Sequence, residues 1–169
     1  CFLKIGSNND FNRFAAEARG LELISLTNTV QTPQVLSLGN IRDNAYILME
    51  FLDMRPQTNH SALELGKQLA KMHKTTADSF GLEQTNWIGL TEQLNKQETD
   101  WVVFYKDQRL LPQLELAYSK GYTTTLEDKA THLLNNLDVF FEDYEPVPSL
   151  LHGDLWSGNW GTLYNNEPV

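Results

Sequence analysis

The residues best suited to chemistry lie near the end of the sequence, where Asp154 precedes Asn159 by five positions in a polar turn. Two apolar residues, Leu150 and Leu151, lead into this turn. An aspartate can accept the proton of an attacking hydroxyl, and an asparagine a short loop away can hold a Mg²⁺ ion that neutralises phosphates. The pair therefore favours phosphoryl transfer. The alternative is an Asx-type turn in which both side chains only satisfy backbone groups.

A lysine and a glutamate near the start of the sequence strengthen this interpretation. Lys4 is the only charge in Cys1–Ile5, an apolar stretch typical of a strand. Asp10 is the expected N-cap of a helix over Phe11–Leu26, and Glu17 lies in the middle of that helix. If the helix packs beside the strand, Glu17 reaches Lys4, and in kinases such a pair places a lysine ammonium on nucleotide phosphates. The alternative is that Lys4 protects a sheet edge and Glu17 is solvated.

The next stretch is expected to complete a small sheet and to end in a hinge. Further strands are predicted at Gln34–Leu38 and Asn44–Leu52, followed by a polar break over residues 53–60. In a kinase-like fold such a break presents backbone groups to adenine. The Glu50 carbonyl and the Leu52 amide are then the predicted adenine contacts, with Met49 behind the ring. Any buried strand that is followed by a loop would show the same pattern.

The remaining sequence is expected to be mostly helical. Helices are predicted over Ala62–Lys74, Asp100–Lys120 and Thr125–Phe141, and a strand over Trp160–Tyr164. The stretch Ser79–Lys96 is too aromatic for a passive linker, so it is the best candidate for a substrate-facing loop, which would present Trp87. Pro112 is expected to kink the second of these helices. Arg109 in the same helix could meet a substrate carboxylate or phosphate, and a structural ion pair is an equal alternative.

The composition and charge of the sequence argue against some classes of binding partner. The 169 residues carry 13 Lys and Arg against 22 Asp and Glu, a formal charge of −9. This charge argues against a nucleic-acid binder and against an anionic membrane surface. A nucleotide substrate stays compatible with it, because one lysine and Mg²⁺ can bind phosphates locally. The single cysteine, Cys1, permits no internal disulfide, and no apolar run approaches transmembrane length, so a cytoplasmic protein is expected. His73 is expected at a helix end, and no zinc site is predicted.

Several short motifs spread along the chain occur together in one family. They are Phe2-Leu3-Lys4, Ala16-Glu17-Ala18 with Leu21, Leu48-Met49-Glu50, Trp87-Ile88-Gly89, Gln93, Asn95, Asp100 through Tyr105, Gln108-Arg109-Leu110, Pro112-Gln113-Leu114, and Leu150 through Asn159. Within the last motif, His-x-Asp-x-x-x-x-Asn follows the kinase catalytic loop, with Gly153 in place of the arginine of protein kinases. With these motifs the sequence resembles the fructosamine (ketosamine) 3-kinase family, a branch of the aminoglycoside-phosphotransferase-like, protein-kinase-like superfamily.

The resemblance implies an ATP- and Mg²⁺-dependent transfer of phosphate to the 3-hydroxyl of a fructosamine or ribulosamine, either free or on a protein, as a step of deglycation repair. It assigns Asp154 as the base, Asn159 as a Mg²⁺ ligand, Lys4 as the phosphate clamp and Glu17 as its orienting partner. Trp156 is a candidate wall for the sugar. The alternative for Trp156 is a core tryptophan under the loop.

The resemblance also implies the fold class, α+β, as a protein-kinase-like two-lobe fold truncated at both ends. Residues 1–52 would form part of the N-lobe, and residues 53–169 part of the C-lobe, with the catalytic loop at 150–159. The family's phosphate loop would precede Cys1, and the aspartate that is the main Mg²⁺ ligand would follow Val169. We therefore expect the full-length parent to be an active kinase and these 169 residues alone to be inactive, or nearly so.

Two other functions stay open from the sequence. One is a kinase for another small molecule, of the aminoglycoside or choline kinase type, whose site would be strongly acidic if the substrate were a polycation. The other is a non-catalytic nucleotide-binding fragment. The presence of Lys4, Glu17, Asp154 and Asn159 together argues against this second possibility. The sequence does not determine the preferred ketosamine or the oligomeric state.

Overall fold

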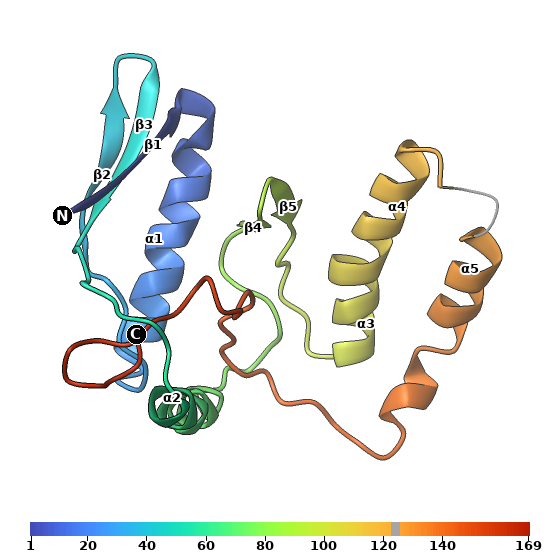
Figure 1. Ribbon diagram of the computed structural model, residues 1–169. Coiled ribbons are helices and arrows are strands. Elements are labelled where there is room, and N and C mark those ends of the chain that lie inside the picture. Colours follow the sequence, from blue (N-terminus) through green and yellow to red (C-terminus); the bar gives the residue numbers. More distant parts are fainter. Residues whose placement is uncertain (123–125) are drawn as a thin grey trace. The chain divides into compact units, whose positions relative to one another are not determined.

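The computed structural model describes residues 1–122 and 126–169, a mixture of helices and small sheets (Figure 1). These residues form two compact units. The first comprises Cys1–Thr76 and Ser149–Val169, and the second Ala77–Pro148. The expected lobe boundary between residues 52 and 53 falls inside the first unit, so the lobe division stays a prediction. No helix within the described residues combines the length and apolar character needed to cross a bilayer.

The first unit contains a three-stranded antiparallel sheet. Its strands are β1 (Phe2–Ser7), β2 (Val35–Ile41) and β3 (Asn44–Met49), in the order β1-β3-β2. We predicted that the third strand would continue to Leu52. This is wrong: β3 ends at Met49, because neither neighbouring strand offers a pairing residue beyond it. Phe2 and Val35 both pair with Met49 at the ends of their strands. Strand β2 extends beyond the predicted Leu38, and the turn that follows it places Arg42 at a φ of 53°.

One helix covers a face of this sheet. Helix α1 spans Phe11–Leu26, the predicted bounds. Its Phe14 is buried against Ala45, Ile47 and Met49 of β3, and further apolar side chains pack around this core. Asp10 is the N-cap residue of α1, as predicted, but its side chain makes no capping bond in the described chain. Its carboxylate instead accepts hydrogen bonds from the backbone N–H and the hydroxyl of Ser7, 2.8 and 3.0 Å away. The short turn Asn8–Asp10 thus joins β1 to α1.

Helix α2 (Asn59–Met72) begins three residues earlier than predicted. The reason is that Thr58 is its N-cap, whereas we expected Ser61, the residue before Ala62, to be the N-cap. The Thr58 hydroxyl accepts a hydrogen bond from the Ser61 N–H (3.0 Å), and the Ser61 hydroxyl accepts one from the Thr58 N–H (2.9 Å). This reciprocal arrangement is a capping box. His73 follows as the C-cap, and its backbone N–H donates to the Leu69 carbonyl.

The segment from Ser149 to Val169 returns to the first unit as a loop and a short hairpin. The strand predicted over Trp160–Tyr164 is wrong, since in the described chain Thr162 is the only residue of this stretch that forms bridges, one to Arg55 and one to Pro168. A lone bridge on each side cannot propagate a ladder. The hairpin is closed by Gly161 and Val169, whose backbone groups bond each other in both directions at 2.9 and 3.1 Å.

The second unit combines a hairpin with helices. The hairpin of β4 (Asn86–Ile88) and β5 (Thr91–Gln93) lies in the stretch that we predicted as a loop. Helices α3 (Trp101–Tyr105) and α4 (Leu111–Ser119) are joined by a π-helical turn over Lys106–Leu110. Proline has no N–H to donate to the preceding turn, and its ring crowds the carbonyl four residues earlier. The wider π-helical turn before Pro112 accommodates the proline.

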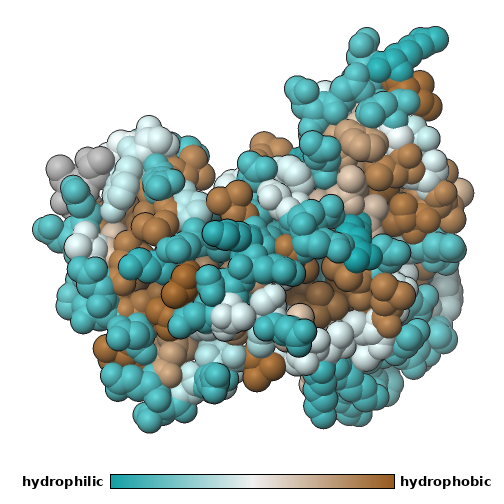
Figure 2. All heavy atoms as spheres, turned by 180° about the vertical axis from the view of Figure 1, so that it is seen from behind, coloured by the Kyte–Doolittle hydropathy of each residue, from teal (hydrophilic) through white to brown (hydrophobic). Residues whose placement is uncertain are grey.

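The last helix of the second unit is shorter than predicted. We expected a helix over Thr125–Phe141, but its first residue lies outside the described residues. The described part consists of α5 (Glu127–Asn135) and a separate 3₁₀ turn, Asp138–Phe141. Phe140 of this turn is 67% exposed. On the face of the molecule drawn in Figure 2, hydrophobic residues (brown) reach the surface between hydrophilic ones (teal).

Candidate active site

Lys4 and Glu17 form an ion pair between the sheet and the helix. The Lys4 ammonium donates to both carboxylate oxygens of Glu17, at 2.8 and 2.7 Å. Lys4 pairs with Ile47 of β3, and residues directly opposite in a sheet project from the same face. Because Ile47 is buried in the core against α1, Lys4 also projects toward that helix. The alternative, a solvated Glu17 and a lysine that only protects an edge, is therefore wrong.

Asp154 and Asn159 are joined by their own hydrogen bonds. The Asn159 amide group donates to the Asp154 carbonyl at 2.8 Å and to the Asp154 carboxylate at 3.0 Å. A turn places Asn159, since its backbone N–H donates to the Trp156 carbonyl at 2.9 Å. The Asx-turn alternative is thus realised in part, because Asn159 does satisfy a backbone group. In the described chain, however, Asn159 Oδ1 and Asp154 Oδ1 have no hydrogen-bond partner.

The glycine and histidine before Asp154 shape this loop. Gly153 has a φ of 85°, a left-handed conformation that a side chain disfavours. His152 Nδ1 accepts a hydrogen bond from the Asp154 N–H at 3.3 Å, which requires the unprotonated nitrogen. The ring borders a cavity of about 80 Å³ with apolar side chains such as Leu65, Leu69 and Met72 in its wall. Burial lowers the pKa of His152 below its ordinary value, and the charge of Asp154 opposes this only in part.

The side-chain oxygens at the catalytic loop are of the kind that binds Mg²⁺. Mg²⁺ prefers oxygen ligands and is commonly held by one or two carboxylates or amide oxygens together with substrate phosphates. Because the Asn159 N–H groups are directed at Asp154, the amide oxygen Oδ1 is the atom that remains for a cation. Among residues 1–122 and 126–169, no cluster of three His, Cys, Asp or Glu side chains forms a metal cage. At this loop, Asn159 Oδ1 and Asp154 Oδ1 are the side-chain oxygens that could contribute to holding Mg²⁺.

The predicted adenine contacts lie at the end of β3. Met49 is 4% exposed and packs in the core beneath α1. The Glu50 N–H donates to the Gln34 carbonyl at 2.8 Å, and the Glu50 carboxylate accepts from the Gln34 N–H at 3.3 Å. In the part of the chain that the structure describes, the Glu50 carbonyl and the Leu52 N–H have no hydrogen-bond partner. These are the two backbone groups that we predicted as the adenine contacts.

The predicted substrate residues lie in both units. In the first unit, Trp156 is 59% exposed, so the core alternative for this tryptophan is wrong. Its indole covers Gly158 so closely that a Cβ there would overlap the ring. In the second unit, Trp87 lies half-buried in β4, opposite Glu92. Their roles toward a substrate stay predictions.

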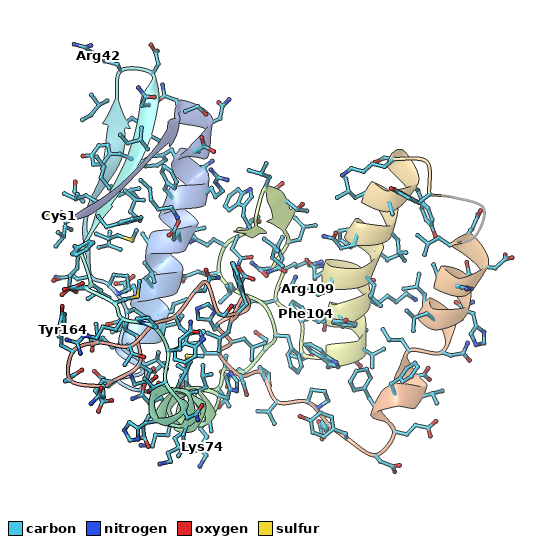
Figure 3. All side chains as sticks on the ribbon, in the orientation of Figure 1. Cys1, Arg42, Lys74, Phe104, Arg109 and Tyr164 are labelled. Carbon is cyan, nitrogen blue, oxygen red and sulfur yellow. The ribbon has the colours of Figure 1, made fainter. Side chains whose placement is uncertain are left out.

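Arg109 is held within the second unit. Its guanidinium donates to the carbonyls of Leu94 (2.5 Å) and Gln108 (2.9 Å) and to Asn95 Oδ1 (2.7 Å). It also lies over the ring of Phe104, 4.7 Å from the centroid (Figure 3). Burial lowers the pKa of Arg109 below its ordinary value. The observed contacts are structural but involve carbonyl groups, not the ion pair that we gave as the alternative.

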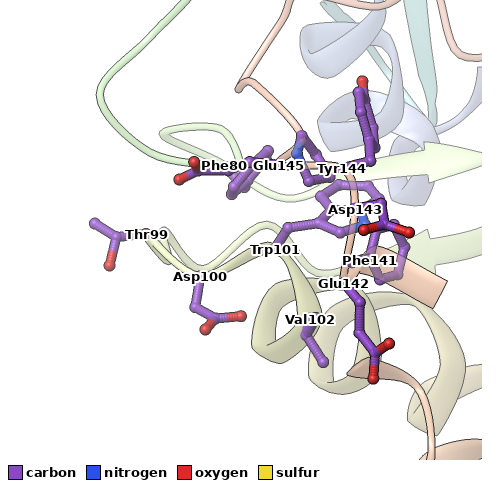
Figure 4. Close-up of a pocket in the computed structure, with 11 residues that line it drawn as sticks. Phe80, Thr99, Asp100, Trp101, Val102, Phe141, Glu142, Asp143, Tyr144 and Glu145 are labelled. Atoms are coloured by element: carbon purple, nitrogen blue, oxygen red, sulfur yellow. The ribbon is translucent and has the colours of Figure 1, made fainter. Parts of the chain in front are cut away.

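The second unit also carries an open pocket of about 800 Å³ (Figure 4). Its wall combines aromatic residues, among them Phe80, Trp101 and Tyr144, with the acidic residues Asp100, Glu142 and Asp143. None of the predicted site residues lines it. The Trp101 indole N–H is buried and has no hydrogen-bond partner among the residues that the structure describes.

One residue at the loop was missed from the sequence. The Gln57 side chain donates to the carbonyls of Ser157 (2.5 Å) and Trp160 (2.9 Å), on either side of Asn159. The residues lie about a hundred positions apart in the chain, and no local pattern around Gln57 indicates the contact.

Comparison with known proteins identifies the family. The sequence model of the fructosamine kinase family matches residues 1–169, which is the whole chain. The chain belongs to the fructosamine kinase family. This confirms the resemblance that the motifs indicated.

Individual proteins named as ribulosamine or ketoamine kinases are also similar in sequence to this chain. The chain is 42% identical over 159 residues to an Arabidopsis thaliana protein named protein-ribulosamine 3-kinase, chloroplastic, covering 92% of this chain and 48% of that protein. It is 38% identical over 159 residues to the probable ketoamine kinase YniA of Escherichia coli strain K12, covering 94% of this chain and 54% of the relative. The chain thus spans about half the length of the relatives that it matches.

Two solved structures have a fold similar to that of this chain. A fructosamine-3-kinase candidate from Haemophilus somnus 129PT superposes with a TM-score of 0.88 at 27% identity, covering 99% of this chain and 56% of that one. A second candidate, from Thermobifida fusca YX-ER1, gives a TM-score of 0.80 at 32% identity, with coverages of 99% and 58%. The mixed α and β fold of this chain is therefore shared with structures from the fructosamine kinase family.

Proposed function

We propose that the protein containing this chain is an ATP-dependent ketosamine 3-kinase, which phosphorylates the 3-hydroxyl of fructosamines or ribulosamines. The observation that carries this proposal is that the first unit forms both required pairs, Lys4 with Glu17 and Asp154 with Asn159. Support for the acceptor comes from the relatives, which are named for ribulosamine and ketoamine substrates. We further propose a cytoplasmic enzyme, in keeping with the single cysteine.

In the proposed reaction, Asp154 accepts the proton of the substrate hydroxyl as that oxygen forms a bond to the γ-phosphorus. The bond from phosphorus to the bridging oxygen of ADP breaks at the same time, and ADP leaves with the bonding electrons. Lys4 neutralises the α- and β-phosphates, and Glu17 keeps the ammonium in place. Asn159 would hold Mg²⁺ through Oδ1. The bound ion would neutralise charge that develops on the phosphates.

The same proposal assigns the remaining site residues. ATP would bind with its adenine against the Glu50 carbonyl and the Leu52 amide, beside Met49. Trp156 offers an exposed aromatic wall for the sugar, with Trp87 and Arg109 as further candidates. We also propose a protein-kinase-like two-lobe fold, with its lobes at 1–52 and 53–169.

The test is ATP consumption by the product of the whole gene with a fructosamine, a ribulosamine and an aminoglycoside side by side. We expect turnover with a ketosamine, and a loss of about 10²–10⁴-fold in kcat for Asp154→Asn, the usual range for a general base. Asp138→Asn, a similar change at an exposed aspartate of the second unit, is the matched control and should keep full activity.

Two outcomes would overturn the proposal. Turnover with the aminoglycoside alone would show that the acceptor is an aminoglycoside and not a ketosamine. ATP binding without turnover on any of the three would favour a non-catalytic nucleotide-binding protein.

A further inference from the structure

The connector between β3 and α2 lies along the segment that follows the catalytic loop. The Arg55 N–H donates to the Thr162 carbonyl at 2.7 Å, and the Thr162 N–H donates back to the Arg55 carbonyl at 3.2 Å. The Thr162 hydroxyl donates to the buried Ser61 hydroxyl at 2.7 Å. These bonds fix the backbone of the connector beside the loop without any contribution from the Gln57 side chain.

Gln57 projects from this fixed connector onto the catalytic loop itself. Its amide nitrogen donates to the Ser157 carbonyl at 2.5 Å and to the Trp160 carbonyl at 2.9 Å. A glutamine NH₂ group has two protons, so both are used. The two carbonyls flank Gly158 and Asn159, and one side chain therefore fixes the path of the backbone on both sides of Asn159.

The bonds continue from there to the proposed catalytic base. The Asn159 N–H donates to the Trp156 carbonyl at 2.9 Å, which sets the turn. The Asn159 side chain donates to the Asp154 carbonyl and carboxylate. A displaced turn would move Asn159 Oδ1 and release the Asp154 carboxylate from its only side-chain donor in the described chain.

We propose that Gln57 is a positioning residue that holds Asn159 and, through it, Asp154 in the geometry needed for phosphoryl transfer. The proposal rests on the proposed kinase function for its catalytic part. Gln57 is exposed and touches the loop through its amide, so the hydrogen-bond donors carry the effect and the bulk of the side chain does not.

The experiment compares three variants of the product of the whole gene. Gln57→Met keeps the length of the side chain and removes both donors. Gln57→Lys restores donors that can reach two carbonyls. Gln68→Met is the matched control: Gln68 lies on α2, and its amide bonds Glu167 (3.3 Å), which lies beyond the loop.

The first measurement needs no ligand. Hydrogen–deuterium exchange is followed over residues 150–160, with residues 11–26 of α1 as the reference for global unfolding. Two neutral hydrogen bonds are lost in Gln57→Met, so we expect exchange in the loop to accelerate about tenfold while that of α1 is unchanged. Gln57→Lys and Gln68→Met should exchange like the wild type.

The second measurement is the dependence of kcat on the Mg²⁺ concentration. We expect Gln57→Met to need about tenfold more Mg²⁺ for half-maximal rate, with the KM for the ketosamine unchanged and with rescue by Gln57→Lys. A residue that matters only for stability would change the unfolding midpoint and leave this dependence alone.

The outcomes separate this proposal from the function on which it rests. If Gln57→Met accelerates hydrogen exchange in the loop but the wild-type protein has no kinase activity, Gln57 positions the loop and the proposed function is refuted. Unchanged loop exchange and Mg²⁺ dependence in an active enzyme would refute the role of Gln57 and leave the function standing. Equal effects of Gln57→Met and Gln57→Lys would also refute it, since donors would then not matter.

Discussion

At the scale of single residues, the ion pair between Lys4 and Glu17 is partly exposed, with side-chain exposures of 39% and 33%. Pairs in such positions contribute only about 0–1 kcal/mol to folding, because solvent screens them and ordering two long side chains opposes them. A charge aimed at phosphates in the transition state has a much larger effect on rate. Stability and activity should therefore respond very differently to the loss of this pair.

We predict that Lys4→Met and Glu17→Gln each lower kcat/KM of the whole gene product by about 10²-fold or more. The unfolding midpoint should change little. Lys67→Met is the control, because it breaks a comparable pair with Glu64 (2.6 Å) on α2. Steady-state kinetics and thermal unfolding measure both effects. A similar loss of rate in Lys67→Met would contradict the prediction.

His152 predicts a dependence of stability on pH. Burial lowers its pKa below 6.5 in the folded protein, so the unfolded chain binds the proton more readily. The stabilisation is present above pH 6.5 and is lost as the pH falls from 6.5 toward the lowered pKa. Protonation of Nδ1 also removes the acceptor for the Asp154 N–H.

We therefore expect the wild type to lose more unfolding free energy between pH 7.5 and 5.5 than His152→Asn, which keeps an acceptor that does not titrate. Denaturant unfolding at several pH values measures this. His132→Asn, at an exposed histidine of α5, should behave like the wild type. Parallel curves for wild type and His152→Asn would refute the assignment.

At the scale of elements, backbone conformation distinguishes glycines that look alike in the sequence. Gly153 in the catalytic loop has a φ of 85°, and Gly66 lies within α2. A Cβ at either position would meet none of the described residues within 4 Å. The left-handed conformation costs a residue with a side chain about 1–2 kcal/mol. In a helix, alanine is favoured over glycine by about 1 kcal/mol.

Alanine substitutions should accordingly have opposite effects at these two positions. Gly153→Ala is expected to destabilise the protein by about 1 kcal/mol, and Gly66→Ala to stabilise it by somewhat less. Equilibrium unfolding in denaturant measures both. Effects of the same sign would show that space, and not backbone conformation, decides the outcome.

At the scale of the whole molecule, the second unit is inserted between two neighbouring points of the first. Thr76 and Ser149 form an antiparallel bridge, and the Leu150 N–H donates to the Thr75 carbonyl at 2.9 Å. The Cα atoms of such a pair lie about 4.5–5.5 Å apart. A two-residue turn can span this distance.

Replacement of residues 77–148 by Gly-Gly should thus leave the first unit folded, with α1 protected from hydrogen exchange. An equally long deletion of residues 61–132 is the control, because it removes Ser61 and its buried bond to Thr162. Exchange over residues 11–26 measures the result. Complete exchange of α1 in the first deletion would show that the first unit depends on the second.

The sequence by itself determined the elements whose signals are local. The bounds of α1 followed from its apolar spacing, and the strand of Lys4 and the family followed from short motifs. The predicted helix, the strand of Lys4 and the family were confirmed because helix periodicity and motif spacing are set by residues close together in the chain. The types and spacing of Asp154, Asn159, Lys4 and Glu17 indicated groups for phosphoryl transfer, and these roles stay predictions.

Only the tertiary structure decided which distant groups meet. It brought Lys4 to Glu17 through the register of β1 on β3, and it placed Gln57 on carbonyls about a hundred residues away. It also exposed Trp156 and left Trp160–Tyr164 without a ladder. The physical reason is that a hydrogen bond or an exposed face depends on the partner that packing supplies, and no local pattern records that partner.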